Sequence, residues 1–180
     1  MIDQELKKWF EIIDEFSYES LECQEAYEAI NLYFNRAENY RKQINVCLNE
    51  YGDENYSSII IEIFFAHFSS NREKLIYFLE EIFKLSQGNK DDFELLYLCS
   101  DFELELEDYP LFCKDIFSSA SKYALQGNFY IRSAAIYLLT ASYCHLDTTN
   151  QRKLDGILSD SINDSDWKIR YMTYEYLQDN

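Results

Sequence analysis

Residues that break helices are rare in this chain. Its 180 residues include four glycines and one proline, while apolar residues recur at intervals of three and four, the spacing of one face of an α-helix. Strands would need strict alternation, and the sequence gives them little support. We therefore predict an all-α fold in a single domain, residues 1–180, which is long enough to bury a core without a disulfide or a metal.

Capping residues and glycines predict where the helices begin and end. Side chains that can accept hydrogen bonds from a first helical turn stand at Ser17, Asn35, Asp53, Ser70, Asp91 and Asp108. Glycines that can end a helix stand at Gly52, Gly88 and Gly127. The expected helices cover 4–15, 18–34, a segment between Asn35 and Gly52, 56–68, a segment between Ser70 and Gly88, 91–98, 110–125, 129–144, 150–162 and 167–177.

The last third of the chain contains an internal repeat. Residues 128–139, NFYIRSAAIYLL, align with residues 166–177, DWKIRYMTYEYL, at a period of 38 residues. An aromatic residue, an Ile-Arg pair and the closing Leu coincide. This pattern resembles the HEAT repeat, in which a short acidic turn leads into a second helix with a branched aliphatic residue, then Arg, then small residues and Leu.

The resemblance covers residues 109–177 well, and upstream it survives only as helix-pair spacing. It implies a right-handed stack of about five antiparallel helix pairs, a HEAT-like α-solenoid, in which each pair buries the apolar face of the next. It also assigns Arg132 and Arg170 to a ladder of hydrogen bonds with turn carboxylates such as Asp164 or Asp166.

Motifs for catalysis or metal binding are not recognisable. There is no GxGxxG or P-loop to hold a phosphate, no HExxH or ExxH pair and no CxxC pair. Cys144 and His145 are adjacent and would point about 100° apart on a helix, so we favour a core thiol beside a helix-terminal histidine over a catalytic pair. We expect a non-enzyme without cofactor or metal, with five reduced core thiols: Cys23, Cys47, Cys99, Cys113 and Cys144.

Hydrophobicity and charge indicate where the protein acts. The densest apolar run, 59–68, is interrupted by Glu62 and His67 and is shorter than the ~20 residues that span a bilayer. The first ten residues also include the charged Asp3, Glu5, Lys7 and Lys8, where a signal peptide would need an uninterrupted apolar segment after its basic start. We therefore expect a cytoplasmic protein without a membrane partner.

The chain carries 33 acidic and 16 basic residues, a formal net charge of −17 at pH 7. A protein that binds nucleic acid directly needs a basic surface, so we expect no direct nucleic-acid contact. The acidic field attracts basic proteins instead. Because many proteins are acidic only for solubility, charge alone identifies no partner.

Two features are candidates for a binding surface. Between Asp101 and Asp108, acids alternate with Phe102, Leu104 and Leu106, so an extended chain would project carboxylates about 6 to 7 Å apart. A solvated loop and a binding surface remain equal alternatives for this stretch, whereas the series Glu15 to Glu28 is interpreted as a solvent-facing side. Tyrosines offer large contact area, and those on the repeated helices are divided between core and surface. The predicted partner-binding residues are Asp101, Glu103, Glu105, Glu107, Asp108, Tyr109, Tyr130 and Tyr171.

A small acidic helical protein without a catalytic motif looks like the immunity proteins that bacteria pair with secreted toxins, including those of contact-dependent growth inhibition. The resemblance rests on composition, size and architecture. It implies that the chain binds a cognate toxin domain, a basic nuclease, and occludes its active site. The alternatives are a helical-repeat adaptor or scaffold for a basic protein or peptide, and an enzyme with an unrecognised carboxylate site.

Overall fold

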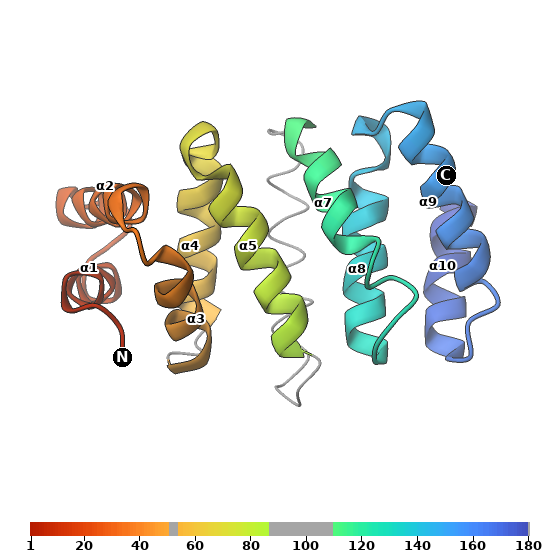
Figure 1. The fold of residues 1–180 in the computed structure, drawn as a ribbon, viewed down its shortest axis with the longest axis horizontal. Helices are drawn as coiled ribbons and strands as arrows, with labels where there is room; N and C mark the ends of the chain where they lie inside the picture. Colours follow the sequence, from red (N-terminus) through yellow and green to blue (C-terminus); the bar gives the residue numbers. More distant parts are fainter. Residues whose placement is uncertain (51–53, 87–109, 180) are drawn as a thin grey trace. The chain divides into compact units, whose positions relative to one another are not determined.

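The computed structural model describes residues 1–50, 54–86 and 110–179 (Figure 1). Within these ranges every regular element is helical and no strand occurs, which confirms the predicted all-α class there. The elements are α1 (Gln4–Glu15), α2 (Leu21–Arg36), α3 (Tyr40–Glu50), α4 (Glu54–Ala66), α5 (Phe68–Ser86), the short 3-10 helix η1 (Pro110–Phe112), α7 (Cys113–Ala120), α8 (Phe129–Ala141), the 3-10 helix η2 (Tyr143–His145), α9 (Thr148–Ser161) and α10 (Trp167–Asp179).

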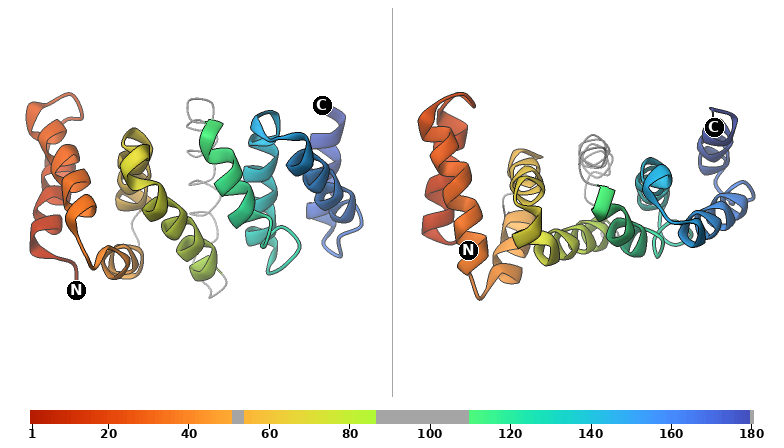
Figure 2. Two further views of the ribbon diagram at one scale, coloured as in Figure 1. Left: turned by 45° about the horizontal axis from the view of Figure 1, so that its top comes forward. Right: turned by 90° about the horizontal axis from the view of Figure 1, so that it is seen from above.

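The chain forms two compact units, Met1–Phe78 and Leu79–Asn180. In the first unit α1 lies beside α2, and α4 packs against both α2 and α3 (Figures 1 and 2). In the second unit α8 packs against α7, α9 and α10.

Aromatic rings form the centre of the first unit. The ring of Phe34 on α2 meets that of Phe64 on α4 edge to face, with centroids 5.2 Å apart, and Phe64 meets Phe78 on α5 at 6.3 Å. All three rings are fully buried. Edge-to-face contacts of this kind add to the stabilisation from burying apolar area, so these rings join α2, α4 and α5 into one core.

A pair of buried asparagines also joins α2 to α5. The side-chain amide of Asn71 donates to Oδ1 of Asn31 over 2.8 Å, and Asn35 donates to the same oxygen over 3.2 Å. Buried amides need such partners to offset their loss of water. The apolar core and this polar contact therefore both hold α5 against α2.

Three of the predicted N-caps in the first unit are wrong. Ser20, and not Ser17, caps α2 by accepting a hydrogen bond from the backbone N–H of Cys23 over 3.1 Å, because Ser17 instead begins the turn closed by Ser20 N–H. Asn35 lies in the last turn of α2 and does not open α3. Ser70 lies inside the first turn of α5, where its hydroxyl donates to the carbonyl of His67.

Helix ends in the second unit differ most from prediction in two places, α7 and α8. Helix α7 ends at Ala120 and not at Leu125, because the following backbone forms tight turns, with Tyr123 N–H donating to the Ala120 carbonyl. Gly127 then adopts a left-handed φ of 100°, which favours glycine. Helix α8 ends at Ala141 and gives way to η2. The remaining predicted signals, Gly52, Asp53, Gly88, Asp91 and Asp108 with the helix 91–98, lie outside the described residues.

Cys23, Cys113 and Cys144 are free thiols. Cys23, Cys47 and Cys113 are buried as predicted. Cys144 is exposed, so the prediction of a core thiol there is wrong. The reason is that α8 has already ended and Cys144 lies in the surface turn η2. Cys99 lies outside the described residues.

Candidate protein-binding surface on the last helix

Helices α8 and α10 begin with side-chain caps at equivalent positions of the repeat. The side chain of Asn128 accepts a hydrogen bond from the backbone N–H of Ile131 over 3.1 Å at the start of α8. At the start of α10, Asp166 accepts from the backbone N–H of Lys168 over 3.0 Å. These caps satisfy donors that have no partner in the first helical turn. The repeat found in the sequence thus corresponds to two helices with equivalent first turns.

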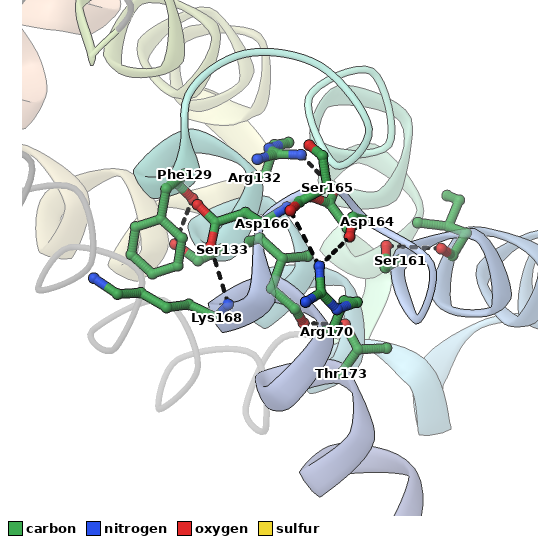
Figure 3. Close-up of polar contacts among 12 residues, drawn as sticks. Phe129, Arg132, Ser133, Ser161, Asp164, Ser165, Asp166, Lys168, Arg170 and Thr173 are labelled. Carbon is green, nitrogen blue, oxygen red and sulfur yellow. Dashed lines mark hydrogen bonds and ion pairs between the residues drawn. The ribbon is translucent and has the colours of Figure 1, made fainter.

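The turn between α9 and α10 binds both repeated arginines (Figure 3). Arg132 forms an ion pair with Asp164, and the two side chains are only 13% and 7% exposed. Arg170 donates to the main-chain carbonyls of Asp164 over 2.6 Å and Ser165 over 3.1 Å. The predicted contact with a turn carboxylate is confirmed for Arg132. It is wrong for Arg170, whose guanidinium donates to main-chain carbonyls of the turn instead of to a carboxylate.

Helix α8 is buried on nearly every side. Its buried residues follow one another around the whole helix, as expected for a helix surrounded by protein. They are Ile131, Ser133, Ala134, Ala135, Ile136, Leu138 and Leu139.

Helix α10 is buried on one side only. Ile169 and Thr173 are fully buried. Trp167, Tyr171 and Tyr174 are 62%, 56% and 54% exposed, and their spacing of four and three places them on one side of the helix. At 100° per residue this side is opposite Ile169. We call these three residues the aromatic stripe, and the exposed Leu177 lies at its edge.

The hydroxyl groups of the aromatic stripe have partners on α10 itself. Tyr171 donates to the carboxylate of Glu175, and this hydrogen bond, with the negative charge of Glu175, raises the pKa of Tyr171. Gln178 donates to the hydroxyl of Tyr174 over 2.6 Å. Among the residues that the structure describes, no other ring stacks on the stripe. The rings therefore offer apolar surface together with polar groups already held in place.

The predicted binding residues fall in different places. Tyr171 belongs to the aromatic stripe. Tyr130 is half-buried at the start of α8, where its ring meets that of Phe129 at 5.1 Å. No hydrogen bond or ring contact joins Tyr130 to Tyr171 in the described part of the chain. The other predicted residues, Asp101, Glu103, Glu105, Glu107, Asp108 and Tyr109, lie outside the described residues.

The predicted binding residues do not include Trp167, although it belongs to the aromatic stripe. The alignment equates it with Phe129, which is half-buried and has the ammonium group of Lys168 5.2 Å from its ring centroid. The signal that could have identified it is the spacing Trp167, Tyr171, Tyr174 on the side opposite Ile169. An apolar repeat on both sides of a helix predicts either burial or a contact surface.

Comparisons of this sequence and structure with protein-family models, curated proteins and solved structures give no match. Within the described ranges no group of three or more His, Cys, Asp or Glu side chains is arranged to hold a metal ion. No helix there is both long and apolar enough to cross a bilayer. What the α10 surface provides is contact area with hydrogen-bonding groups at its edge.

Proposed function

We propose that this chain is a non-catalytic immunity protein that binds and neutralises a cognate secreted toxin, a basic nuclease domain, through the aromatic stripe of α10. The observation that carries the proposal is the exposure of Trp167, Tyr171 and Tyr174 on the outer side of that helix. The proposal also places the protein in the cytoplasm, without membrane or direct nucleic-acid partners.

Large aromatic residues exposed in line on one helix call for an explanation. Apolar surface that gathers on one exposed side of a protein often marks a site of interaction with another protein. Trp and Tyr are also the residues that most often contribute strongly to binding when a partner covers them. Three of them in line on α10 therefore support a protein-binding role for this face.

Charge supports the choice of a basic partner. A net charge of −17 accelerates the encounter with a positively charged protein, and buried aromatic side chains then slow dissociation. A nuclease needs cationic groups to hold its substrate, so an acidic protein seated on that surface excludes RNA or DNA. The proposed mechanism is occlusion of the active site.

The proposed architecture is a HEAT-like solenoid, a right-handed stack of about five antiparallel helix pairs. Support comes from the second unit alone. Helices α8 and α10 share their caps and the position of their arginines, and they pack against one another. A repeated helix that contacts its counterpart is the basic feature of such stacks.

We expect the gene for this chain to lie next to a gene for a large secreted protein with a toxic domain. The test is a titration of that toxic domain with the purified chain. Equimolar protein should abolish the nuclease activity of that domain. Protection at a small fraction of the toxin concentration would instead indicate catalytic detoxification. Binding that leaves nuclease activity intact would favour the adaptor alternative.

Substitution then locates the surface. Changing Trp167, Tyr171 and Tyr174 together to Ser should weaken binding about a hundredfold or more, because such residues carry much of the binding energy at interfaces. Leu111→Ser is the matched control, since Leu111 is also an exposed apolar residue of the second unit. Equal affinities for the triple variant and the wild type would remove α10 from the interface.

The acidic stretch remains a second predicted contact. Replacing Glu103, Glu105 and Glu107 with Gln deletes three charges and keeps side-chain size. If these acids face Lys or Arg of the toxin, affinity should fall about a hundredfold. Unchanged affinity would mean that these three residues belong to a solvated loop outside the interface.

A further inference from the structure

The first unit contains a pocket of about 410 Å³. It lies between α2, α4 and the two segments that precede α2 and follow α4. Its lining is aromatic, acidic and apolar, and consists of Tyr18, Gln24, Tyr27, Glu28, Glu62, Ile63, Ala66 and His67. The volume is in the range of about 300–1,000 Å³ that is usual for sites that hold small ligands.

Two tyrosines hold one carboxylate in this pocket. The hydroxyl of Tyr18 donates to Oε1 of Glu62 over 2.7 Å, and that of Tyr27 donates to Oε2 over 3.0 Å. The two rings meet edge to face with centroids 5.7 Å apart. Burial and the negative charge of Glu62 raise the pKa of Tyr27, so its hydroxyl remains a donor. Glu62 is thus fixed in position by two tyrosines that lie 44 and 35 residues away in sequence.

The charge of this carboxylate is not balanced. Both hydrogen bonds to Glu62 come from neutral groups, and an ionised carboxylate can accept about four. No Lys or Arg lines the pocket. Among the residues that the structure describes, neither Glu62 nor Glu28 forms an ion pair. The pocket therefore has two carboxylates, one of them positioned, and its one basic side chain is the imidazole of His67.

We propose that this pocket binds the side chain of an arginine from a basic partner protein. The planar guanidinium group donates in a fork that matches a carboxylate and also stacks on aromatic rings. Tyr18 and Tyr27 offer such rings for a cation. Ile63 and Ala66 provide an apolar wall for the methylene stem. Charge, shape and lining all fit this one group.

This inference goes beyond the proposed function and does not rest on it. All of the pocket residues belong to the first unit, and none belongs to α10. An arginine bound here would be a contact separate from the aromatic stripe.

The experiment uses the full chain and two small probes. Nα-acetyl-arginine methylamide carries the cation, and the citrulline analogue has the same shape without charge. Titration followed by amide NMR should give saturable shifts for the arginine probe, centred on residues of α2 and α4, and at least about tenfold weaker binding for citrulline. Equal binding of both probes, or shifts that do not saturate, would overturn the proposal.

Variants separate the pocket from general attraction to an acidic protein. Glu62→Gln should weaken arginine binding at least about tenfold, because Gln keeps the size and can still accept a tyrosine hydroxyl while the charge is lost. Glu22→Gln is the matched control, since it removes the same charge from an exposed position of α2 outside the pocket. Equal losses in the two variants would overturn the proposal.

Glu28→Gln provides a second pocket variant, and thermal melts of each variant confirm that the unit still folds. If Glu62→Gln fails to fold, Glu28→Gln decides, and full retention of arginine binding there would overturn the proposal. Failure of the arginine titration leaves toxin binding through the aromatic stripe standing. Loss of toxin binding in the triple Ser variant likewise leaves the arginine titration unchanged.

Discussion

Helices α8 and α10 share a local sequence pattern and have different surroundings. Asn128 and Asp166 cap them from equivalent positions, and each helix carries an arginine at its fourth position. The positions of Tyr171 and Tyr174 on α10 correspond to Ser133 and Ile136 on α8, which are buried. The same side of the helix is therefore covered in α8 and exposed in α10.

The difference teaches what a repeat pattern determines. The capping residue, the aliphatic residue and the arginine determine where each helix begins and which of its sides packs inward. The capping interactions are local, and both arginines bind the same turn between α9 and α10. Whether the opposite side is covered depends on the residues that pack against it. Large aromatics at that side on α10 are for this reason more informative about function than the residues that the two helices share.

The largest expected effect separates the two arginines. Arg132→Met should lower the free energy of unfolding of the second unit by about 3–5 kcal/mol, because it leaves Asp164 buried without a cation. Arg170→Met, the matched control, removes hydrogen bonds to carbonyls and should cost about 1.5–3 kcal/mol. Urea unfolding in a Trp9→Phe background reports on the second unit, since Trp167 is then the one tryptophan. Equal losses would mean that the two arginines do not differ as described.

The next comparison tests the two outer sides directly. Ile136→Ala on α8 should cost about 2–5 kcal/mol, as expected for a large-to-small change in a core. Tyr174→Ala at the equivalent position of α10 should change stability by no more than about 0.5 kcal/mol. Melting curves of both variants give the difference. A large loss for Tyr174→Ala would show that this side of α10 is covered.

A smaller effect distinguishes the two carboxylates that flank α9, the buried Asp164 and the exposed Asp147. The pKa of Asp147 is lowered by the backbone N–H of Asn150 and by Lys114, whose ammonium lies 3.3 Å away. The pKa of Asp147 is lower in the folded protein than in the unfolded protein. The contribution of its carboxylate to stability is therefore complete above the unfolded-state pKa and is lost as pH falls through the folded-state pKa. The melting temperatures of wild type and Asp147→Asn should therefore converge between about pH 5 and pH 2. A difference that grows on acidification would contradict the assignment.

The smallest effect concerns two thiols of the second unit. Cys113 is buried, and burial raises its pKa to about 11, so the reactive thiolate is scarce. Cys144 is exposed. In a Cys99→Ser background, a thiol reagent should modify Cys144 of the native protein quickly and Cys113 only on unfolding. A fast phase that persists in Cys144→Ser would place the accessible thiol elsewhere.

Local sequence patterns predicted those features of the fold that depend on residues close together in the sequence. The bounds of α1 follow from apolar spacing, and the Arg132–Asp164 contact is one that the resemblance to HEAT repeats implied. The caps at Asn35 and Ser70 failed because the same spacing also occurs inside a helix. The Glu62 pocket was not predictable, because its tyrosines lie 44 and 35 residues away in sequence and only packing brings them together.

The central claim is that a partner covers the aromatic stripe, and the emission of Trp167 tests it most directly. The measurement uses a Trp9→Phe variant and a toxin domain without tryptophan, with complex formation followed in parallel by calorimetry. Trp167 is 62% exposed in the free chain, so its emission should shift to the blue and saturate at one equivalent of toxin. Complex formation with unchanged Trp167 emission would contradict the claim.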